Sequence, residues 1–539
     1  MGQNDARPGF ISRFFRGHRW WIPTGIVLLA AGIIAYARAQ PELESNMKNM
    51  YTIMVSALSF LLLCGWLLLL SGFRWRVRFL SLGAAVLLVV AFRLTVREDG
   101  AVNGAGMPNL TWKWSPQKDA SLPALKTQPS ATAQVDLKTT HANDYPQFLG
   151  PNRDGVLMGV SLERDWNAHP PRQLWRQPIG VGWSSFAVVG ANAITQEQRG
   201  DQELVVCYDV KTGQPRWIHS NTDRFQEPQG GDGPRATPTI SEGRVYAFGG
   251  NGILDCLDGA NGGLIWSHKV LKENNTENII WGKSSSPLLV DDLVVVSGGS
   301  KGGPSLLAYR KAKGELAWKA GEDMSAYASP VLATLAGKRQ IVMLSAKSVT
   351  GHNPADGKLL WRYDWPGDWP KVSQPAVVGN DQLFVAAGYG QGCALLQIGP
   401  EKDGRQQVSE VWRNRNLKSQ FSNNIVRDGF IYGLDDGVLA CVDVKTGKRK
   451  WKDARYGHGQ LLLVGDLLLV QAETPGDIVL LEISPQGSKE LARLPALATK
   501  TWNHAALAPP YLLVRNDQEA VCYELTMGKP PAGTVSRSR

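Results

Sequence analysis

The 539-residue sequence has only six cysteines, scattered along its whole length. So few cysteines in so long a chain exclude a disulfide scaffold. No two of them are adjacent and none forms a C-x-x-C or C-x-x-C-H motif, which excludes zinc ribbons and c-type haem attachment. Charged residues make up 20% of the chain against 43% hydrophobic residues, a balance that excludes wholesale disorder. We therefore expect a folded protein with a large apolar core.

Several common functional motifs are also missing. The glycine-rich segment 298–303 matches neither the P-loop nor the Rossmann fingerprint, and no hydrolase nucleophile elbow is present. The net charge of +10 does not indicate nucleic acid, because residues 1–100, with eleven Lys+Arg and five Asp+Glu, carry +6 of it. No basic stripe with interleaved aromatics occurs elsewhere. We therefore predict a protein with no nucleic-acid partner.

Three apolar segments, 20–37, 51–70 and 77–96, dominate the first hundred residues. Each has about the length needed to cross a hydrocarbon core of roughly 30 Å. Arg93 interrupts the third segment, and we expect its side chain to snorkel to the membrane surface. The sequence therefore predicts an integral membrane anchor of three transmembrane helices over residues 1–97.

The flanking charges predict the orientation of this anchor. Basic residues precede the first span and lie between the second and third: Arg7, Arg13, Arg16, Arg19, Arg74, Arg76 and Arg78. By the positive-inside rule, the N-terminus is cytoplasmic and the chain after residue 97 lies in the periplasm of a bacterium, anchored in the inner membrane. Two alternatives stay open: the first span is a cleaved signal peptide, or the third fails to span and leaves the rest in the cytoplasm.

The remaining chain divides into three parts. Residues 98–140 are rich in Pro, Gly, Ser and Thr and predict a flexible linker, whereas 528–539 predict a disordered tail. Within the linker, the Trp112-Lys113-Trp114 segment can rest at the membrane interface or pack on the folded domain. Residues 141–527 form the folded domain.

The folded domain contains a repeat that its tryptophans reveal. Cys207-Tyr-Asp-Val-Lys-Thr-Gly-Gln-Pro-Arg-Trp217 recurs at Cys441–Trp451 and, with Asn for Thr, at Cys256–Trp266. Successive repeat tryptophans from Trp217 to Trp451 are 49, 52, 43, 51 and 39 residues apart, a period typical of propeller blades. Looser copies end at Trp318, Trp361 and Trp412, a seventh near Leu491 has lost its Trp, and an eighth starts at Cys522.

Each part of the repeat has a physical role. Asp and Thr-Gly form a tight turn between two outer strands, and the following Trp docks against the next blade. The eighth copy stops before its last strand, which residues 174–176 can supply, and this exchange closes the ring. The repeat cysteines are expected to be small, buried core residues rather than disulfide partners.

This pattern resembles the tryptophan-docking motif of quinoprotein dehydrogenase-type eight-bladed propellers, a superfamily that includes the non-enzymatic propeller lipoprotein of outer-membrane assembly. The segments Tyr145–Gly155, Gly233–Pro238 and Tyr327–Pro330 are similar to those of bacterial PQQ-binding-like β-propeller repeat proteins. The resemblance implies an all-β, eight-bladed quinoprotein-type propeller after the α-helical anchor. It does not imply bound pyrroloquinoline quinone (PQQ).

A candidate ligand site follows from the propeller. The segments that start each innermost strand converge on the central channel and bring polar, cationic and aromatic side chains to one mouth, which suits a planar anionic ligand. The predicted site residues are Trp183, Arg235, Lys283, Tyr327, Gln374, Asn423, His458 and His504. The alternative is a water-filled structural channel whose Ser, Thr and Pro residues cap the strand starts.

Two functions are compatible with this sequence. The favoured one is a membrane-tethered periplasmic module that binds or scaffolds envelope proteins or a small ligand. The alternative, implied by the resemblance, is a PQQ-dependent membrane dehydrogenase of alcohols or sugars that uses calcium and a catalytic carboxylate. Against it, the mouth lacks a carboxylate pair, although Glu227 and Asp232 lie in a Gly-rich loop nearby. We predict no metal ligands, and the catalytic residues and cofactor stay unassigned.

Overall fold

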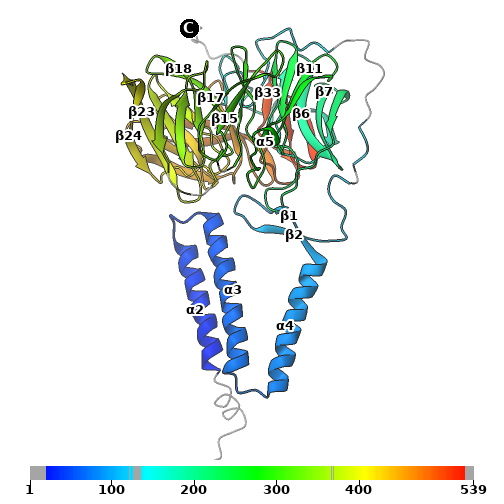
Figure 1. Ribbon diagram of the computed structural model, residues 1–539, viewed down its shortest axis with the longest axis vertical. Coiled ribbons are helices and arrows are strands. Elements are labelled where there is room, and N and C mark those ends of the chain that lie inside the picture. Colours follow the sequence, from blue (N-terminus) through cyan, green and yellow to red (C-terminus); the bar gives the residue numbers. More distant parts are fainter. Residues whose placement is uncertain are drawn as a thin grey trace, which may run out of the picture. The chain divides into compact units, whose positions relative to one another are not determined.

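The computed structural model describes residues 20–120, 122–125, 135–300, 302–365, 367 and 370–528. The predicted tail after Gly528 and the basic residues before the first span lie outside the described residues. The chain divides into two compact units, residues 1–115 and 116–539 (Figure 1). We describe each unit by itself.

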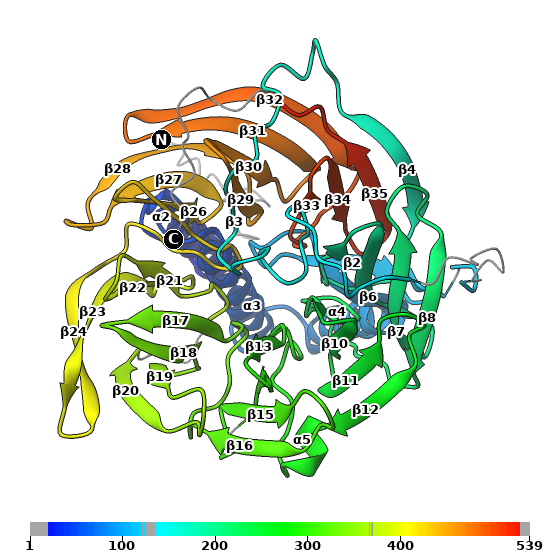
Figure 2. The same cartoon turned by 90° about the horizontal axis from the view of Figure 1, so that it is seen from above.

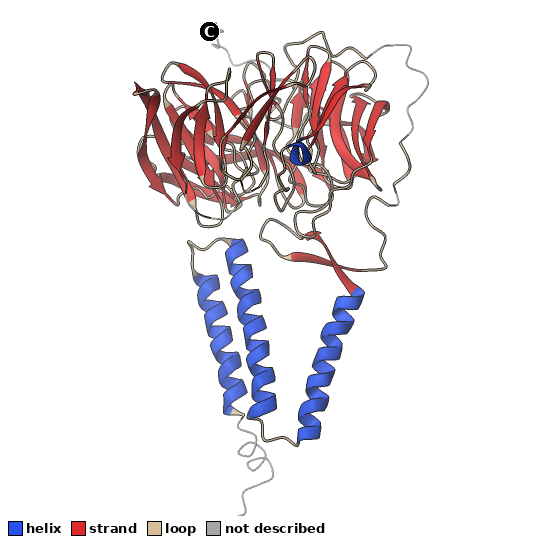
Figure 3. Ribbon diagram, in the orientation of Figure 1, coloured by secondary structure: helices blue, strands red, loops and turns tan. Residues whose placement is uncertain are grey.

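The first unit contains three long helices, α2 (Trp21–Ala39), α3 (Ser45–Leu69) and α4 (Trp75–Thr95), shown in blue in Figure 3. All three are long and apolar enough to cross a membrane, which confirms the three predicted apolar helices. Arg93 lies in the last turn of α4.

Contacts at the two ends of these helices fix their relative direction. The rings of Trp20 before α2 and Trp66 near the end of α3 have centroids 5.5 Å apart. At the other end, the side-chain amide of Asn49 in α3 donates to the carbonyl of Ala105, which follows α4, at 2.9 Å. The helices therefore alternate in direction, and the chain leaves α4 at the end opposite to the start of α2.

The segment after α4 is a β-hairpin. Strands β1 (Val96–Ala101) and β2 (Pro108–Trp112) pair antiparallel, with Val96 opposite Trp112. The predicted linker of residues 98–140 thus begins with regular structure. Further along, Val135 and Leu137 are buried against the blade that follows, so its last residues belong to the second unit.

The second unit is a ring of eight antiparallel sheets, or blades, seen from above in Figure 2. Blade 1 consists of β5 (Ala187–Val189), β6 (Asn192–Arg199), β7 (Gln202–Asp209) and β8 (Pro215–Asn221). Blade 2 consists of β9 (Thr239–Ser241), β10 (Arg244–Phe248), β11 (Ile253–Asp258) and β12 (Leu264–Lys269), followed by the short helix α5 (Val270–Glu273). Blade 3 consists of β13 (Leu288–Val290), β14 (Leu293–Ser297), β15 (Leu306–Arg310) and β16 (Leu316–Ala320). Blade 4 consists of β17 (Val331–Leu335), β18 (Lys338–Leu344), β19 (Ser348–His352) and β20 (Leu359–Asp364).

The second half of the ring repeats this order. Blade 5 consists of β21 (Ala376–Val378), β22 (Gln382–Ala387), β23 (Gly392–Lys402) and β24 (Arg405–Asn414). Blade 6 consists of β25 (Ile425–Arg427), β26 (Phe430–Asp435), β27 (Val438–Asp443) and β28 (Arg449–Arg455). Blade 7 consists of β29 (Gln460–Val464), β30 (Leu467–Gln471), β31 (Gly476–Ser484) and β32 (Gly487–Leu497), with β3 (Val156–Leu157) added on its inner edge. Blade 8 consists of β33 (Ala506–Ala508), β34 (Tyr511–Arg515), β35 (Glu519–Glu524) and β4 (Arg172–Pro178).

The tryptophans dock as the repeat predicts. The indole N–H of Trp217 in blade 1 donates to the carbonyl of Gly259 in blade 2 at 2.9 Å. The ring packs on Gly262, whose φ of +75° favours glycine and where a Cβ would lie 2.6 Å from the indole. Five other blade junctions have the same bond, from Trp175, Trp266, Trp318, Trp412 and Trp451. Trp361 is the exception, since its N–H donates to Gln340 of its own blade.

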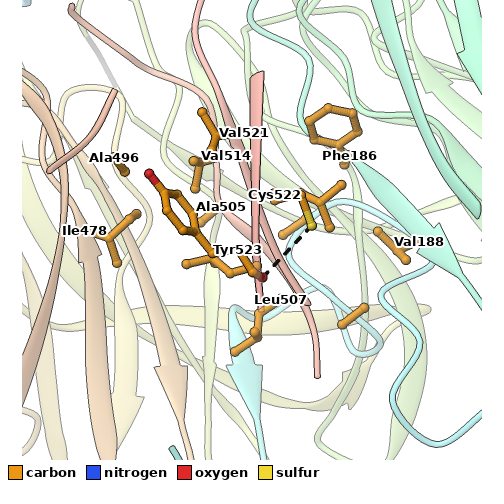
Figure 4. Close-up of a cluster of buried hydrophobic side chains, with 14 of the residues drawn as sticks. Phe186, Val188, Ile478, Ala496, Ala505, Leu507, Val514, Val521, Cys522 and Tyr523 are labelled. Carbon is orange, nitrogen blue, oxygen red and sulfur yellow. Dashed lines mark hydrogen bonds between the residues drawn. The ribbon is translucent and has the colours of Figure 1, made fainter. Parts of the chain in front are cut away.

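The ring closes because a strand from the start of the domain completes the last blade, as predicted. The N-terminal strand β4 pairs with β35, so that Trp175 faces Cys522 just as Trp217 faces Cys207. Figure 4 shows Cys522 and Tyr523 within the apolar cluster that joins blades 7, 8 and 1. All six cysteines are free, and the five in the propeller are buried, which confirms their structural reading.

Candidate functional site

The residues at and just before the starts of the innermost strands form two rings with a spacing of two residues, because alternate residues of an extended segment point the same way. In each blade one ring residue lies at or just before the start of the innermost strand. We call this ring the belt: Ser185, Thr237, Ser286, Ser329, Gln374, Asn423, Gln460 and His504. Two residues earlier, the second ring contains Trp183, Arg235, Ser284, Tyr327, Val372, Phe421, His458 and Trp502.

The belt connects neighbouring blades through hydrogen bonds. The backbone N–H of one belt residue donates to the side-chain oxygen of the next, as from Ser329 to Gln374 at 2.8 Å and from Gln374 to Asn423 at 2.7 Å. The same bond joins Ser185 to Thr237, Thr237 to Ser286, and Ser286 to Ser329. The predicted site residues Gln374 and Asn423 are therefore used to hold blades together.

His504 completes the belt. Its backbone carbonyl accepts from the hydroxyl of Ser185 at 2.6 Å, and its Nε2 lies 3.3 Å from Nδ2 of Asn423, two blades away. Burial lowers the pKa of His504 to about 3, so the imidazole is neutral and accepts a bond from the amide. Side chains of blades 6 and 8 therefore meet at this level of the ring.

The second ring carries aromatic side chains that meet over the channel. Four aromatics of the second ring form a cluster with two further aromatics, Trp281 and Tyr389. We call this cluster of Trp183, Trp281, Tyr327, Tyr389, Phe421 and Trp502 the collar. Ring centroids are 4.8 Å apart for Trp183 and Trp502, and 5.2 Å apart for Trp502 and Phe421. Trp281 precedes blade 3 and Phe421 precedes blade 6, yet their centroids are 6.5 Å apart. Because these blades are three apart in the ring, the collar lies over the channel axis.

The side chains of the two predicted cations, Arg235 and Lys283, do not lie together at one mouth. The guanidinium of Arg235 donates to the carbonyls of Gly231 and Gly233 in its own loop, and burial lowers its pKa to about 10. Lys283 belongs to neither ring. Its fully buried ammonium donates to the carbonyl of Gly298 and, at 2.9 Å, to the hydroxyl of Ser325, and burial lowers its pKa to about 7.

A cation that the sequence did not reveal lies on the collar instead. Nζ of Lys500 is 4.4 Å from the ring centroid of Trp502 and 5.4 Å from that of Trp183, a cation–π arrangement. The lysine lies two residues before Trp502, and only the paired rings of blades 8 and 1 reveal its role.

His458 belongs to an ionic cluster behind the collar. Its two ring nitrogens each lie 3.6 Å from a carboxylate, that of Asp436 on one side and that of Glu473 on the other. Although burial opposes it, these two carboxylates raise the pKa of His458 to about 9. Glu473 also accepts a bond from the indole N–H of Trp502 at 2.7 Å, so the cluster fixes this collar ring.

The opposite end of the channel is covered by residues 145–157, which we call the plug. Tyr145 pairs with Val188 of blade 1, and the ring of Phe148 lies 4.9 Å from that of His504. The buried guanidinium of Arg153 donates to carbonyls of blades 3 and 4, including that of Pro287 at 3.0 Å. The segment ends in β3 on blade 7, near the centre of the ring in Figure 2. The sequence identified this segment as a family motif but not its position.

These residues do not fit PQQ and calcium. PQQ is a planar tricarboxylate that needs cations and an open stacking face, whereas the collar rings contact one another over the axis. The described residues contain no group of three His, Cys, Asp or Glu that could hold a metal ion. Glu227 accepts bonds from Gln229 and Gly230 of its own loop, and Asp232 pairs with Arg224 at 3.0 Å. Both carboxylates therefore stabilise their loop.

Two solved structures share this architecture. Europium-containing methanol dehydrogenase has a TM-score of 0.50 at 13% identity, over 69% of this chain and 90% of that chain. Quinohemoprotein alcohol dehydrogenase from Comamonas testosteroni has a TM-score of 0.50 at 11% identity, over 74% and 83%. At these identities the likeness shows the fold alone. BamB from Moraxella catarrhalis has a TM-score of 0.46 at 17% identity, over 66% and 100%.

Sequence comparison gives the family. No curated protein sequence matches this chain significantly. A family model described as "Outer membrane protein assembly factor BamB" matches residues 167–276 and 201–453, which together exceed half of the chain. The chain therefore belongs to the PQQ-repeat propeller family that this model defines.

Proposed function

We propose that this protein is a membrane-tethered periplasmic propeller that binds or scaffolds envelope proteins, and that partners dock on the collar. The observation that carries this proposal is the gathering of aromatic rings from several blades at one point over the channel axis. Five of the six collar residues are half-buried, and the neighbouring Ile280 is 80% exposed. Clustered aromatics of this kind are typical of the energetic centre of protein interfaces.

The collar is also rigid before a partner arrives. Trp502 is fixed by Glu473, and the indole N–H of Trp183 donates to the carbonyl of Gly230 at 2.6 Å. Side chains that are already ordered lose little conformational entropy on binding. Lys500 over both indoles, with Arg235 near them, favours a partner segment that combines an apolar anchor with a carboxylate. Of the predicted site residues, Trp183, Arg235 and Tyr327 belong to this docking face, and His458 lies buried behind it.

The proposed location rests on the charges that flank the helices. The turn between α3 and α4, with Arg74, Arg76 and Arg78 around the start of α4, lies at the same end as Trp20. The positive-inside rule puts this end in the cytoplasm and the end of α4 in the periplasm, with the inner membrane as anchor. Protease added to spheroplasts should then cleave the loops of the propeller first and degrade its blades after longer treatment. An N-terminal tag should stay protected from the same protease. A protected propeller with a cleaved tag would reverse the orientation.

Photo-crosslinking tests the docking face. A photoreactive amino acid in place of Tyr389 or Trp281 should give discrete crosslinked envelope proteins in intact cells. The matched control positions are Leu264 and Leu316, which are 54% and 46% exposed on the outer strands β12 and β16. Addition of Phe421→Ser should remove the collar crosslinks without lowering the amount of protein. Equal crosslinking from the control positions, or none from the collar, would refute the proposal.

A PQQ-dependent dehydrogenase is the second candidate, supported by the shared fold with two alcohol-oxidising enzymes. The purified full-length protein would be titrated with PQQ in calcium buffer, with Trp fluorescence for binding and dye reduction by alcohols or sugars for turnover. The geometry of the collar leads us to expect neither response. Saturable quenching with dye reduction would replace the scaffold proposal.

A further inference from the structure

The hairpin β1–β2 is joined rigidly to the last apolar helix. Helix α4 ends at Thr95 and β1 begins at the next residue. The backbone N–H of Lys113 donates to the carbonyl of Thr95 at 2.8 Å, and its ammonium donates to the carbonyl of Arg93 at 2.6 Å. Lysine is a favoured partner for the unpaired carbonyls of a helix C-terminus. The open end of the hairpin is therefore held on the last turn of α4.

The closed end of the hairpin is held on a second helix. Asn49, in the first turns of α3, donates its side-chain amide to the carbonyl of Ala105 at 2.9 Å. Gly106 lies beside Asn46, and a Cβ on the glycine would be 3.9 Å from that of Asn46. The hairpin thus extends from the end of α4 to the start of α3, and its position relative to both helices is fixed.

On β2 and just after it, apolar residues alternate with polar ones, and Glu98 of β1, which lies opposite Leu110, shares the face of the apolar residues. Leu110, Trp112 and Trp114 are two residues apart and are 50%, 52% and 68% exposed. The two indoles stack on each other with centroids 4.9 Å apart and an interplanar angle of 7°, so they lie on the same side. The alternate residues Asn109 and Thr111 are polar and half-buried. Large apolar side chains that are this exposed on a short sheet indicate a surface that is covered by lipid or by another molecule.

The length of α4 helps to identify what covers this surface. Its 21 residues extend about 31 Å, close to the roughly 30 Å of a hydrocarbon core. Trp75 begins the helix and is 59% exposed, so exposed tryptophans lie at both ends of α4, as they do at the two boundaries of a bilayer. We propose that the face of Leu110, Trp112 and Trp114 lies in the headgroup–acyl boundary of the membrane. The hairpin then sets the depth at which the chain leaves the bilayer.

This inference concerns the lipid contact alone and is independent of what docks on the collar. Its test uses the full-length protein in phosphatidylcholine vesicles. Cys64→Ala removes the half-buried thiol in α3, and the five remaining cysteines are buried. An environment-sensitive thiol dye is then placed by Trp114→Cys or Leu110→Cys, with Thr111→Cys as the matched control on the polar face. Leu110→Cys leaves both indoles in place and so guards against a folding effect of losing Trp114.

We expect dye at residues 110 and 114 to emit at shorter wavelength and to lose emission when the vesicles contain lipids with brominated acyl chains. Dye at residue 111 should instead lose emission to iodide in the buffer. Dye at residues 110 and 114 that is insensitive to brominated lipid, whether it is exposed to iodide or shielded from both quenchers, would overturn the proposal. Equal quenching by brominated lipid at all three positions would also overturn it, because the hairpin would then lack an interfacial face.

Discussion

The docking of Trp217 between blades 1 and 2 leads to a quantitative prediction for Trp217→Phe. The indole is 4% exposed, and its N–H is the donor seen for the buried carbonyl of Gly259. Phenylalanine removes that donor, which leaves a buried acceptor unpaired at about 1–3 kcal/mol. The smaller ring also leaves a gap over Gly262, which adds on the order of 1 kcal/mol. We therefore expect the free energy of unfolding to fall by about 2–4 kcal/mol.

The assay is equilibrium denaturation of the purified full-length protein in detergent, followed by near-ultraviolet circular dichroism. Trp114→Phe is the control, because its indole is 68% exposed and the same substitution there opens no buried gap. The control should cost less than about 0.5 kcal/mol, as is usual for surface substitutions. A loss below about 0.5 kcal/mol for Trp217→Phe, or an equal loss in both variants, would refute docking as the source of stability at the blade junctions.

Three further predictions concern the channel and its ends. Because the folded-state pKa of His458 is raised to about 9, its ionic cluster stabilises the fold fully below about pH 6.5, and this contribution is lost as the pH rises through 9; His458→Gln should flatten that part of a pH series of thermal midpoints. Arg153→Met should leave carbonyls of blades 3 and 4 without donors and speed cleavage of the plug by a protease, and an unchanged cleavage rate would contradict the role of this arginine. EDTA should leave the thermal midpoint unchanged, since no metal-binding group of three His, Cys, Asp or Glu occurs in the described residues, whereas a clear drop would reveal a metal site.

The features that the sequence predicts well are those that repeat. The Asp-x-x-Thr-Gly turn and its Trp specify each outer hairpin locally, and several copies reinforce one another, so the blades, the closing strand and the buried cysteines were predictable. The apolar helices were predictable for a similar reason, because length and composition alone identify them.

The channel was less predictable because its geometry depends on contacts between distant blades. Lys283 lies one residue away from the channel-facing register, and this small offset turns its ammonium toward Gly298 instead of the mouth. The contact of Trp281 with Phe421 joins residues 140 positions apart, and no local pattern encodes it. Residues 145–157 carry few periodic features, since irregular segments follow the surface that they cover. The hairpin after α4 was hidden by its Gly and Pro content, although its alternating polar and apolar residues are typical of a strand.

The closure of blade 8 has a consequence for the order in which this chain acquires its structure. Strand β4 is made before the seven other blades and β35 after them, so the two can pair only once those blades have been synthesised. Until then β4 has no partner, and an unpaired strand edge is a template for association with other chains. A nascent chain must keep residues 172–178 from such contacts until residues 519–524 have been synthesised. Premature termination before residue 519 would leave this edge permanently uncovered, so truncated products should be recognised by their tendency to aggregate.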